Sequence, residues 1–258
     1  MRLTIDNKIK LEVFVAIFQL LKSWSTNINI HFQNDKLYIQ SMDKSHICLA
    51  NIKISKEWFS EYHVESPTKI SVDSSHLAII LNYALKHDKL ELKFDDKVDP
   101  DKLYINFLNK VNTISFDHFF EIHLIDFDEE SLEIPAVEYD VEFSSKSKKM
   151  SELFSELLVF GSDLNILCDE NTLEFNSSGD SGKLKVNIPI DDLHEYSISE
   201  GETVDISYSL SHLSKMCTST KLSSDISISI SSEYPMAIKY DIGDDSNVIF
   251  YIAPKITN

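Results

Sequence analysis

The spacing of apolar residues predicts four short amphipathic helices, in the windows 8–22, 74–87, 146–160 and about 209–221. In the first window, Val13, Ile17 and Leu21 recur at the four-residue spacing of one helix face. The second window opens with serines, which suit the N-cap position of a helix. The last two windows repeat this pattern in the second half of the chain.

Between these windows, alternating or β-rich runs predict strands. The clearest run is Ile226–Ile230, where isoleucine and serine alternate without interruption. Further examples are Ile28–Phe32, Leu37–Gln40, Ile47–Ile54, Leu90–Phe94, Leu103–Leu108, Leu184–Ile188 and Val204–Tyr208. Two helices packed on several antiparallel strands in each half predict an α+β fold with the helices on one face.

The two halves are related by a fixed offset of 136 residues. Asn29-Ile30 recurs as Asn165-Ile166, and Ser75-His76-Leu77 recurs as Ser211-His212-Leu213. Separate windows that share one offset indicate a duplicated domain, because a period this long corresponds to a whole domain. We predict an N-terminal lobe over 1–121, a connector over 122–135 and a C-terminal lobe over 136–258. The five acids of the connector oppose its burial.

The chain has a net charge of −18, yet the predicted helices are basic. Their windows hold nine lysines and three acids, so the rest of the chain carries −24. A basic surface on an acidic protein is typical of a protein that faces phosphates. The predicted DNA-facing residues are Lys8, Lys10, Lys22, Lys86, Lys146, Lys148, Lys149, Lys215 and Lys221. The alternative is that these lysines only decorate the solvent faces of ordinary helices.

Lysine supplies almost all of the positive charge, because Arg2 is the only arginine. Bidentate recognition of guanine relies mainly on arginine, whereas lysine suits phosphate contact without sequence preference. This composition favours sliding on double-stranded DNA over sequence-specific docking.

Cysteine usage and hydropathy set further limits. Cys48, Cys168 and Cys217 are far apart and lack C-x-x-C spacing, which predicts buried or idle thiols rather than disulfides or a metal site. No apolar run approaches the roughly 18–20 residues of a membrane span, and the first residues lack a signal-peptide pattern. We expect a soluble intracellular protein with no cofactor and no membrane partner.

Two features imitate enzyme motifs. Gly179-Asp180-Ser181-Gly182 matches the core of a serine-protease motif, but no suitable histidine segment accompanies it, so we predict a loop between two strands. The acid clusters at 95–101 and 126–130 are interpreted as solvated loops rather than a two-metal nuclease site. No Walker-type or G-x-G-x-x-G loop occurs. We predict that the chain is not an enzyme, with a metal-dependent nuclease as a distant alternative.

Four segments resemble the family of PCNA-type DNA sliding clamps: Leu37–Ile47, Leu132–Pro135, Phe175–Gly179 and Phe250–Ile256. The most specific are the string from Gln40 to His46 and the string from Tyr251 to Ile256. The resemblance implies a processivity factor that encircles duplex DNA and tethers DNA polymerase and other replication and repair proteins. It also implies an ATP-dependent clamp loader, and a nuclear location, or a cytoplasmic replication site for a viral protein. The alternative is a clamp-like subunit of a hetero-oligomeric checkpoint ring or viral scaffold.

The resemblance further implies a homotrimer in which six lobes close a pseudo-six-fold ring. The family's edge strands map onto about 115–123 and 175–182. The trimer interface implied in this way comprises Phe119, Phe120, Ile122, Leu157, Phe160, Phe175, Ser177, Ser178 and Gly179. Such pairing removes open sheet edges, which otherwise promote aggregation.

The same resemblance implies a pocket for short partner peptides. Its residues are Met42, His46, Ile47, Leu49, Leu132, Ile134, Pro135, Tyr139, Pro235, Tyr251, Ile252, Ala253 and Pro254. These residue types suit a helical turn with aliphatic and aromatic anchors. His46 or the Ala253 backbone could hold a polar residue of the peptide.

The chain departs from the family pattern in its helices. Val15 and Ala16 stand where paired lysines are usual, and Ser155 replaces a basic residue. Ile79 and Asn82 lie where the second helix normally carries lysine. Lys22 matches a family lysine.

Overall fold

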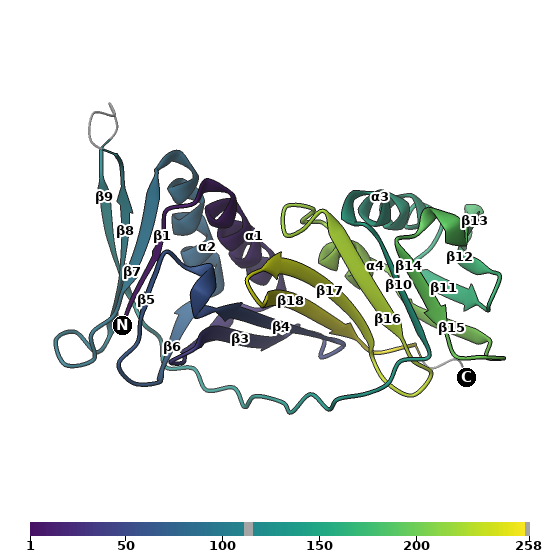
Figure 1. The fold of residues 1–258 in the computed structure, drawn as a ribbon, viewed down its shortest axis with the longest axis horizontal. Coiled ribbons are helices and arrows are strands. Elements are labelled where there is room, and N and C mark those ends of the chain that lie inside the picture. The colour runs from purple at the N-terminus through teal and green to yellow at the C-terminus, as the bar shows by residue number, and fades with distance from the viewer. Residues whose placement is uncertain (111–115, 256–258) are drawn as a thin grey trace. The chain divides into compact units, whose positions relative to one another are not determined.

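The computed structural model describes residues 1–110 and 116–255, which form two compact units (Figure 1). Unit 1 comprises Met1–Lys44, Ala50–Leu132 and Ile242–Val248. Unit 2 comprises Ser45–Leu49, Glu133–Asp241 and Ile249–Asn258. Each unit therefore includes one short segment from the other half of the sequence. The lobe boundaries at 121 and 135 stay a prediction.

Unit 1 contains two helices and two groups of antiparallel strands. One sheet has the order β5-β1-β7-β8-β9, and β4, β3, β2 and β6 are neighbours in that order in the other group. The strands are β1 (Arg2–Ile5), β2 (Asn27–Phe32), β3 (Lys36–Met42), β4 (Cys48–Ser55), β5 (Glu61–His63), β6 (Thr68–Asp73), β7 (Lys89–Lys93), β8 (Lys102–Leu108) and β9 (His118–His123). The helices are α1 (Lys8–Trp24) and α2 (Ser74–Tyr83), with 3-10 turns at Lys56–Trp58 and Ala84–Lys86.

Unit 2 repeats this plan. One sheet has the order β13-β12-β11-β15, and β14, β10, β16, β17 and β18 are neighbours in that order. The strands are β10 (Val141–Lys146), β11 (Asp163–Cys168), β12 (Leu173–Gly179), β13 (Gly182–Asn187), β14 (Glu195–Ile198), β15 (Val204–Ser209), β16 (Asp225–Ile230), β17 (Met236–Gly243) and β18 (Ser246–Ile252). The helices are α3 (Ser147–Leu157) and α4 (Leu210–Met216), with a 3-10 turn at Ile190–Asp192.

The element bounds confirm the duplication. Strand β2 shifted by 136 residues falls on β11, end to end. Helix α2 shifted by the same number begins where α4 begins. In both units the two helices contact each other. The predicted α+β class with antiparallel strands is therefore confirmed.

Helix α1 contributes ten buried residues to the core of unit 1. It begins after Asn7, whose side chain accepts hydrogen bonds from the backbone N–H groups of Ile9 and Lys10. Phe14 and Phe18 are buried, with ring centroids 4.9 Å apart. Full burial of one such side chain contributes about 1.5–3 kcal/mol. Packing against buried Trp58 extends this aromatic cluster.

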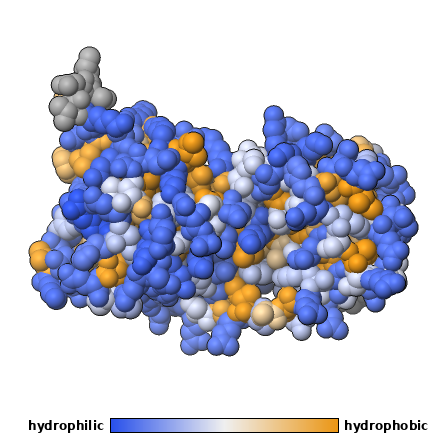
Figure 2. Space-filling model, viewed as in Figure 1, coloured by the Kyte–Doolittle hydropathy of each residue, from blue (hydrophilic) through white to orange (hydrophobic). Residues whose placement is uncertain are grey.

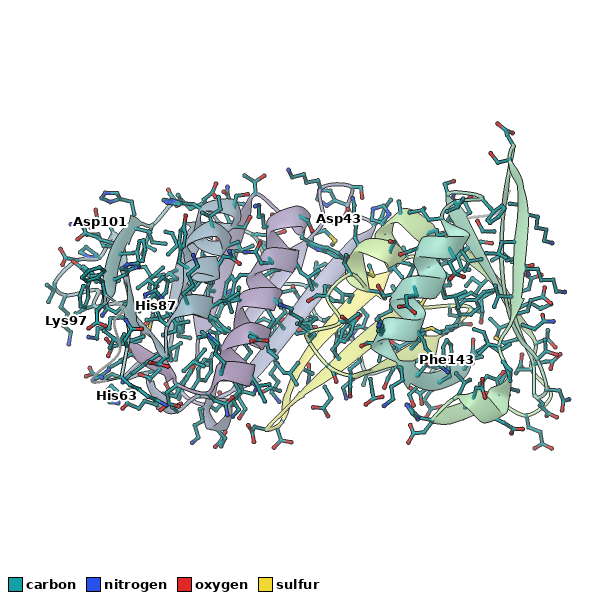
Figure 3. All side chains as sticks on the ribbon, turned by 90° about the horizontal axis from the view of Figure 1, so that it is seen from above. Asp43, His63, His87, Lys97, Asp101 and Phe143 are labelled. Carbon is teal, nitrogen blue, oxygen red and sulfur yellow. The ribbon has the colours of Figure 1, made fainter. Side chains whose placement is uncertain are left out.

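The core of unit 2 centres on three phenylalanines. Phe154 of α3 stacks on Phe175 of β12, with ring centroids 6.1 Å apart and an interplanar angle of 6°. Phe143 of β10, labelled in Figure 3, packs edge-on against Phe175. These contacts bury one face of α3 and leave its lysines on the other.

Several boundaries differ from the sequence prediction; α3, for example, ends at Leu157 rather than at residue 160. Helix α4 ends at Met216 rather than near 221, because the Thr218 hydroxyl donates to the carbonyl oxygens of Ser214 and Lys215 and so competes with the helix. The expected edge strand at 175–182 is wrong, because β12 pairs with β11 and with β13. The edge strands of this sheet are β13 and β15.

The three cysteines are buried thiols, as predicted. Burial raises the pKa of Cys168 to about 11 and that of Cys217 to about 12, so both thiols stay protonated near neutral pH. Hydrophilic residues cover most of the face shown in Figure 2. Within the described ranges, every helix is too short or too polar to span a bilayer.

Candidate interaction surfaces

Two of the predicted DNA-facing lysines are engaged inside unit 1. The Lys8 ammonium donates to the carbonyl oxygen of Leu85. The Lys10 ammonium donates to the Trp58 carbonyl oxygen at 2.8 Å and to Asp244 at 2.6 Å. It also lies 5.4 Å from the centroid of the Trp58 ring. Lys10 therefore has a structural role in this unit.

The other basic residues of the helices differ in their pairing. Lys146 forms a 2.7 Å ion pair with Asp225, and Lys148 lies 3.9 Å from Glu152. Within the described chain, the exposed lysines whose ammonium groups make neither a hydrogen bond nor an ion pair include Lys22, Lys86, Lys149, Lys215 and Lys221. Three of these five belong to unit 2. That the lysines face DNA stays a prediction.

The outer edge of the unit 1 sheet is β9. This strand pairs with β8 through His118–His123, and the sheet order ends there. Phe116 is 86% exposed and Phe119 is 70% exposed beside this edge. Tyr83 of α2 stacks on Phe120 with an interplanar angle of 5°. An apolar surface thus accompanies an unpaired strand edge.

Buried His87, labelled in Figure 3, supports this edge from inside unit 1. Its ring lies 5.4 Å from that of Phe107 and 4.7 Å from that of His118. Its Nδ1 atom is 3.0 Å from the carbonyl oxygen of Tyr83. These contacts join the C-terminal end of α2 to strands β8 and β9.

In unit 2 one edge of the β13-β12-β11-β15 sheet is β13, where Lys183 and Lys185 are exposed. The preceding hairpin connects Gly179 to Gly182 through two residues, which confirms the predicted loop between strands. A Cβ atom on Gly161 would lie 2.5 Å from the Ser178 carbonyl oxygen. The chain after α3 therefore packs closely on the end of β12.

The structure separates the predicted trimer-interface residues into two groups. Phe119, Phe120, Phe160, Ser178 and Gly179 are exposed or half-exposed. The others, Ile122, Leu157, Phe175 and Ser177, are buried within their own unit. Those buried side chains can support an interface but are not free to contact a second chain.

One part of the predicted peptide surface is assembled within unit 2. The Ala253 N–H donates to the Ile47 carbonyl oxygen at 3.1 Å, which places the tail beside the loop at 45–49. His46 in this loop has φ of 56°, a left-handed conformation that is uncommon outside glycine. Burial and the neighbouring Tyr251 raise the pKa of Tyr139. Of the predicted pocket residues in unit 2, only Ile252 is buried; the exposed or half-exposed ones are His46, Ile47, Leu49, Ile134, Pro135, Tyr139, Pro235, Tyr251, Ala253 and Pro254.

The other part lies in unit 1, where Met42 is half-exposed and Leu132 is 49% exposed. Residues 125–132 follow the outside of unit 1. The Ile125 N–H donates to the Ser71 carbonyl oxygen at 2.9 Å. The Lys69 ammonium donates to Asp128 at 2.6 Å and lowers the pKa of that carboxyl.

Sequence reasoning missed the role of Gln40. Its side chain holds Leu132, with the Leu132 N–H donating to Oε1 at 2.6 Å and Nε2 donating to the Leu132 carbonyl oxygen at 3.0 Å. Gln40 begins the specific string Gln40-Ser41-Met42-Asp43. The sequence signal was that Gln40 lies two residues before the predicted pocket residue Met42, because residues two apart on a strand share one face of the sheet.

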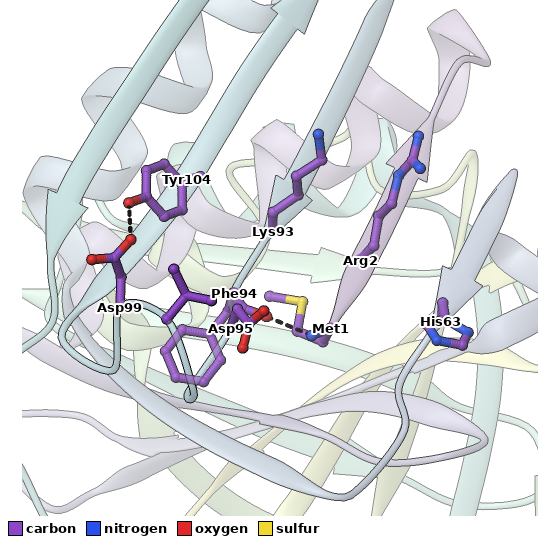
Figure 4. A pocket seen from close by; sticks show the side chains of 9 residues that line it. Met1, Arg2, His63, Lys93, Phe94, Asp95, Asp99 and Tyr104 are labelled. Carbon is purple, nitrogen blue, oxygen red and sulfur yellow. Dashed lines mark hydrogen bonds between the residues drawn. The ribbon is translucent and has the colours of Figure 1, made fainter.

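A cavity of about 320 Å³ opens beside β1 and β7 of unit 1 (Figure 4). Of its charged residues, Arg2 and Lys93 are both paired with buried Glu91, at 2.7 Å in each case. Asp99 accepts a hydrogen bond from Tyr104 at 2.5 Å. Because these charges are satisfied internally, the cavity shows no preference for one ligand chemistry.

Comparison with known proteins gives one consistent result. The family model described as "Proliferating cell nuclear antigen, N-terminal domain" matches residues 8–131, and the corresponding C-terminal domain model matches residues 133–255. The chain is similar to the proliferating cell nuclear antigen of Chaetomium thermophilum, with 27% identity over 250 residues and 95% of each chain covered. It is also similar to the proliferating cell nuclear antigen 2 of Drosophila melanogaster, with 25% identity over 222 residues and 86% of each chain covered.

Proposed function

Because this chain belongs to the proliferating cell nuclear antigen family of DNA sliding clamps, we propose that three copies close head to tail into a ring around duplex DNA. The chain is a processivity factor of DNA replication and repair, and the family acts as a scaffold rather than an enzyme. A hetero-oligomeric checkpoint or viral scaffold is not favoured by these matches.

The observation that best supports the ring is that β9 in unit 1 and β13 in unit 2 are each the last strand of a sheet and so present an unpaired edge. Pairing β9 of one copy with β13 of the next would satisfy both edges, and repeating this contact closes a ring. Phe119 on β9 and Lys183 on β13 are exposed beside these edges, whereas Glu121 and Lys185 are already paired with Lys102 and Glu174. The apolar area around Phe116 and Phe119 would leave water.

Duplex DNA would pass through this ring without sequence-specific contacts. The exposed lysines without protein partners supply the phosphate contacts, and their number is small, so enclosure rather than affinity keeps the clamp on DNA. Lysine contacts of this kind weaken as the salt concentration rises. Because a closed ring has no end, an ATP-dependent loader from other chains would open it.

Partner proteins, including DNA polymerase, would bind through short peptides. In unit 2, the exposed apolar residues of the 45–49 loop and of the tail suit aliphatic and aromatic anchors, and in unit 1 the exposed Leu132 side chain does so. The left-handed conformation of His46 costs about 1–2 kcal/mol for a residue with a Cβ atom, which fits a functional position better than an ordinary turn. We place the protein in the nucleus, or at a cytoplasmic replication site if a virus encodes it.

DNA synthesis with a matched polymerase and clamp loader tests this function. On a primed circular template, the chain should lengthen the products of a single binding event. On a linear template with free ends, the same chain should lose most of this effect, because the ring slides off. Equal stimulation on both templates would contradict encirclement.

A further inference from the structure

Within residues 129–139, all of which the structure describes, Leu132 is the one residue whose backbone is hydrogen-bonded to the rest of the protein. In the described chain, the backbone of residues 129–131 and of residues 133–139 makes no hydrogen bond within the protein, whereas Leu132 makes two. Both go to the side chain of Gln40 on β3. Gln40 itself is only 8% exposed.

The amide of Gln40 is held in one orientation. Its Oε1 atom accepts from the Leu132 N–H at 2.6 Å, and its Nε2 atom donates to the Leu132 carbonyl oxygen at 3.0 Å. Nε2 also donates to the Tyr38 hydroxyl at 3.1 Å. A backbone N–H can only donate and a carbonyl can only accept, so the reversed amide would lose both bonds to Leu132. The side chain therefore substitutes for a neighbouring strand.

The upstream contacts of the connector cannot replace this one. The Ser71 hydroxyl donates to the Phe127 carbonyl oxygen at 3.0 Å, and Lys69 binds Asp128. Both lie at least four residues before Leu132 in the sequence. Without Gln40, the backbone from 129 onward would sample many conformations before a peptide arrives.

We propose that Gln40 is a positioning residue for partner-peptide binding, because it holds the Leu132 backbone so that the exposed Leu132 side chain meets the peptide in one register. This inference rests on the proposed peptide-binding function. Ordering one backbone residue costs roughly 1–2 kcal/mol. A site that is ordered beforehand avoids this cost at the moment of binding.

Two substitutions of Gln40 test the proposal, with a control on the same connector. Gln40→Met keeps the length of the side chain and removes both bonds to Leu132. Gln40→Glu keeps the acceptor for the Leu132 N–H but sets a carboxylate against the Leu132 carbonyl oxygen. Lys69→Met removes the exposed ion pair with Asp128 and leaves Leu132 in place.

The probe is a fluorescent synthetic peptide whose helical turn presents one polar, one aliphatic and two adjacent aromatic residues. By fluorescence anisotropy, Gln40→Met should weaken its binding by about tenfold, and Lys69→Met should change it less than about twofold. Gln40→Glu should regain affinity as the pH falls through the pKa of its carboxyl group, because the neutral acid again offers one donor and one acceptor. A merely structural role would not produce this recovery.

Hydrogen exchange distinguishes a failure of the positioning role of Gln40 from a failure of the proposed peptide surface. The Leu132 amide should exchange faster in Gln40→Met, while the melting temperature and the oligomeric mass stay unchanged. Unchanged peptide affinity despite faster exchange would overturn the positioning role. A lower melting temperature of Gln40→Met together with its weaker peptide binding would also overturn the positioning role, because it would indicate general destabilisation. If the unsubstituted chain does not bind the peptide, the proposed peptide surface itself fails.

Discussion

Phe119 offers the sharpest test of the proposed contact between copies. Its side chain is 70% exposed on the open edge of β9, so its replacement changes little within unit 1. Full burial of a phenylalanine is worth about 1.5–3 kcal/mol, and covering the exposed part in an interface is worth about 1–2 kcal/mol. Phe119→Ala should therefore raise the dissociation constant of each contact by about 5- to 30-fold.

Sedimentation velocity over a range of protein concentrations measures this effect. The unsubstituted chain should stay trimeric at concentrations where Phe119→Ala dissociates, and both should melt at the same temperature. Val98→Ala is the matched control, because Val98 is also 70% exposed but lies in the loop between β7 and β8, beside the cavity of Figure 4. If Phe119→Ala and Val98→Ala associate equally well, the reasoning about the β9 edge is refuted.

Three further predictions concern stability and DNA contact. Gly179→Ala should lower the melting temperature and cost about 1–3 kcal/mol by denaturant unfolding, because its Cβ atom would collide with the Phe160 carbonyl oxygen, whereas Ser178→Ala should not. Lys149→Ala combined with Lys215→Ala should reduce DNA binding and its salt dependence in a filter-binding assay. Lys10→Ala should leave both unchanged, because the ammonium group of Lys10 is already bonded to Asp244. Burial acts to raise the pKa of Glu91, but hydrogen bonds from Lys93 and Asn106 and the charges of Lys93 and Arg2 hold it below its usual value. Its stabilising effect is present above the pKa of an unfolded glutamate, about 4.3, and is lost as the pH falls through the lower folded value. Glu91→Gln should therefore destabilise the protein at pH 7 and progressively less as the pH falls through that folded value.

The helices and the duplication were predictable because each depends on local or repeated pattern. Apolar spacing located α1 and α3, and the offset of 136 residues predicted the correspondence of β2 with β11. The end of α4 was not predictable from apolar spacing, because the hydroxyl of Thr218 rather than a hydrophobic position ends the helix. The edge strand was misplaced by one strand of the hairpin, since strand pairing depends on partners distant in the sequence.

The charge pattern of the sequence did not distinguish lysines with free ammonium groups from lysines that are bonded within the fold. The sequence prediction placed all nine helix lysines on the DNA-facing surface, but Lys8, Lys10 and Lys146 are bonded within their own units. Their partners Leu85, Asp244 and Asp225 lie far away in the sequence, so only the fold reveals the pairing. Gln40 was overlooked for a similar reason, because Leu132 lies 92 residues beyond it.

Electron microscopy of the purified chain tests the central claim most directly. The account predicts particles with threefold symmetry and a central hole, with a mass three times the 29.6 kDa of one chain and with α1 to α4 lining the hole. Single-chain particles, solid particles, or rings whose helices face outward would contradict it.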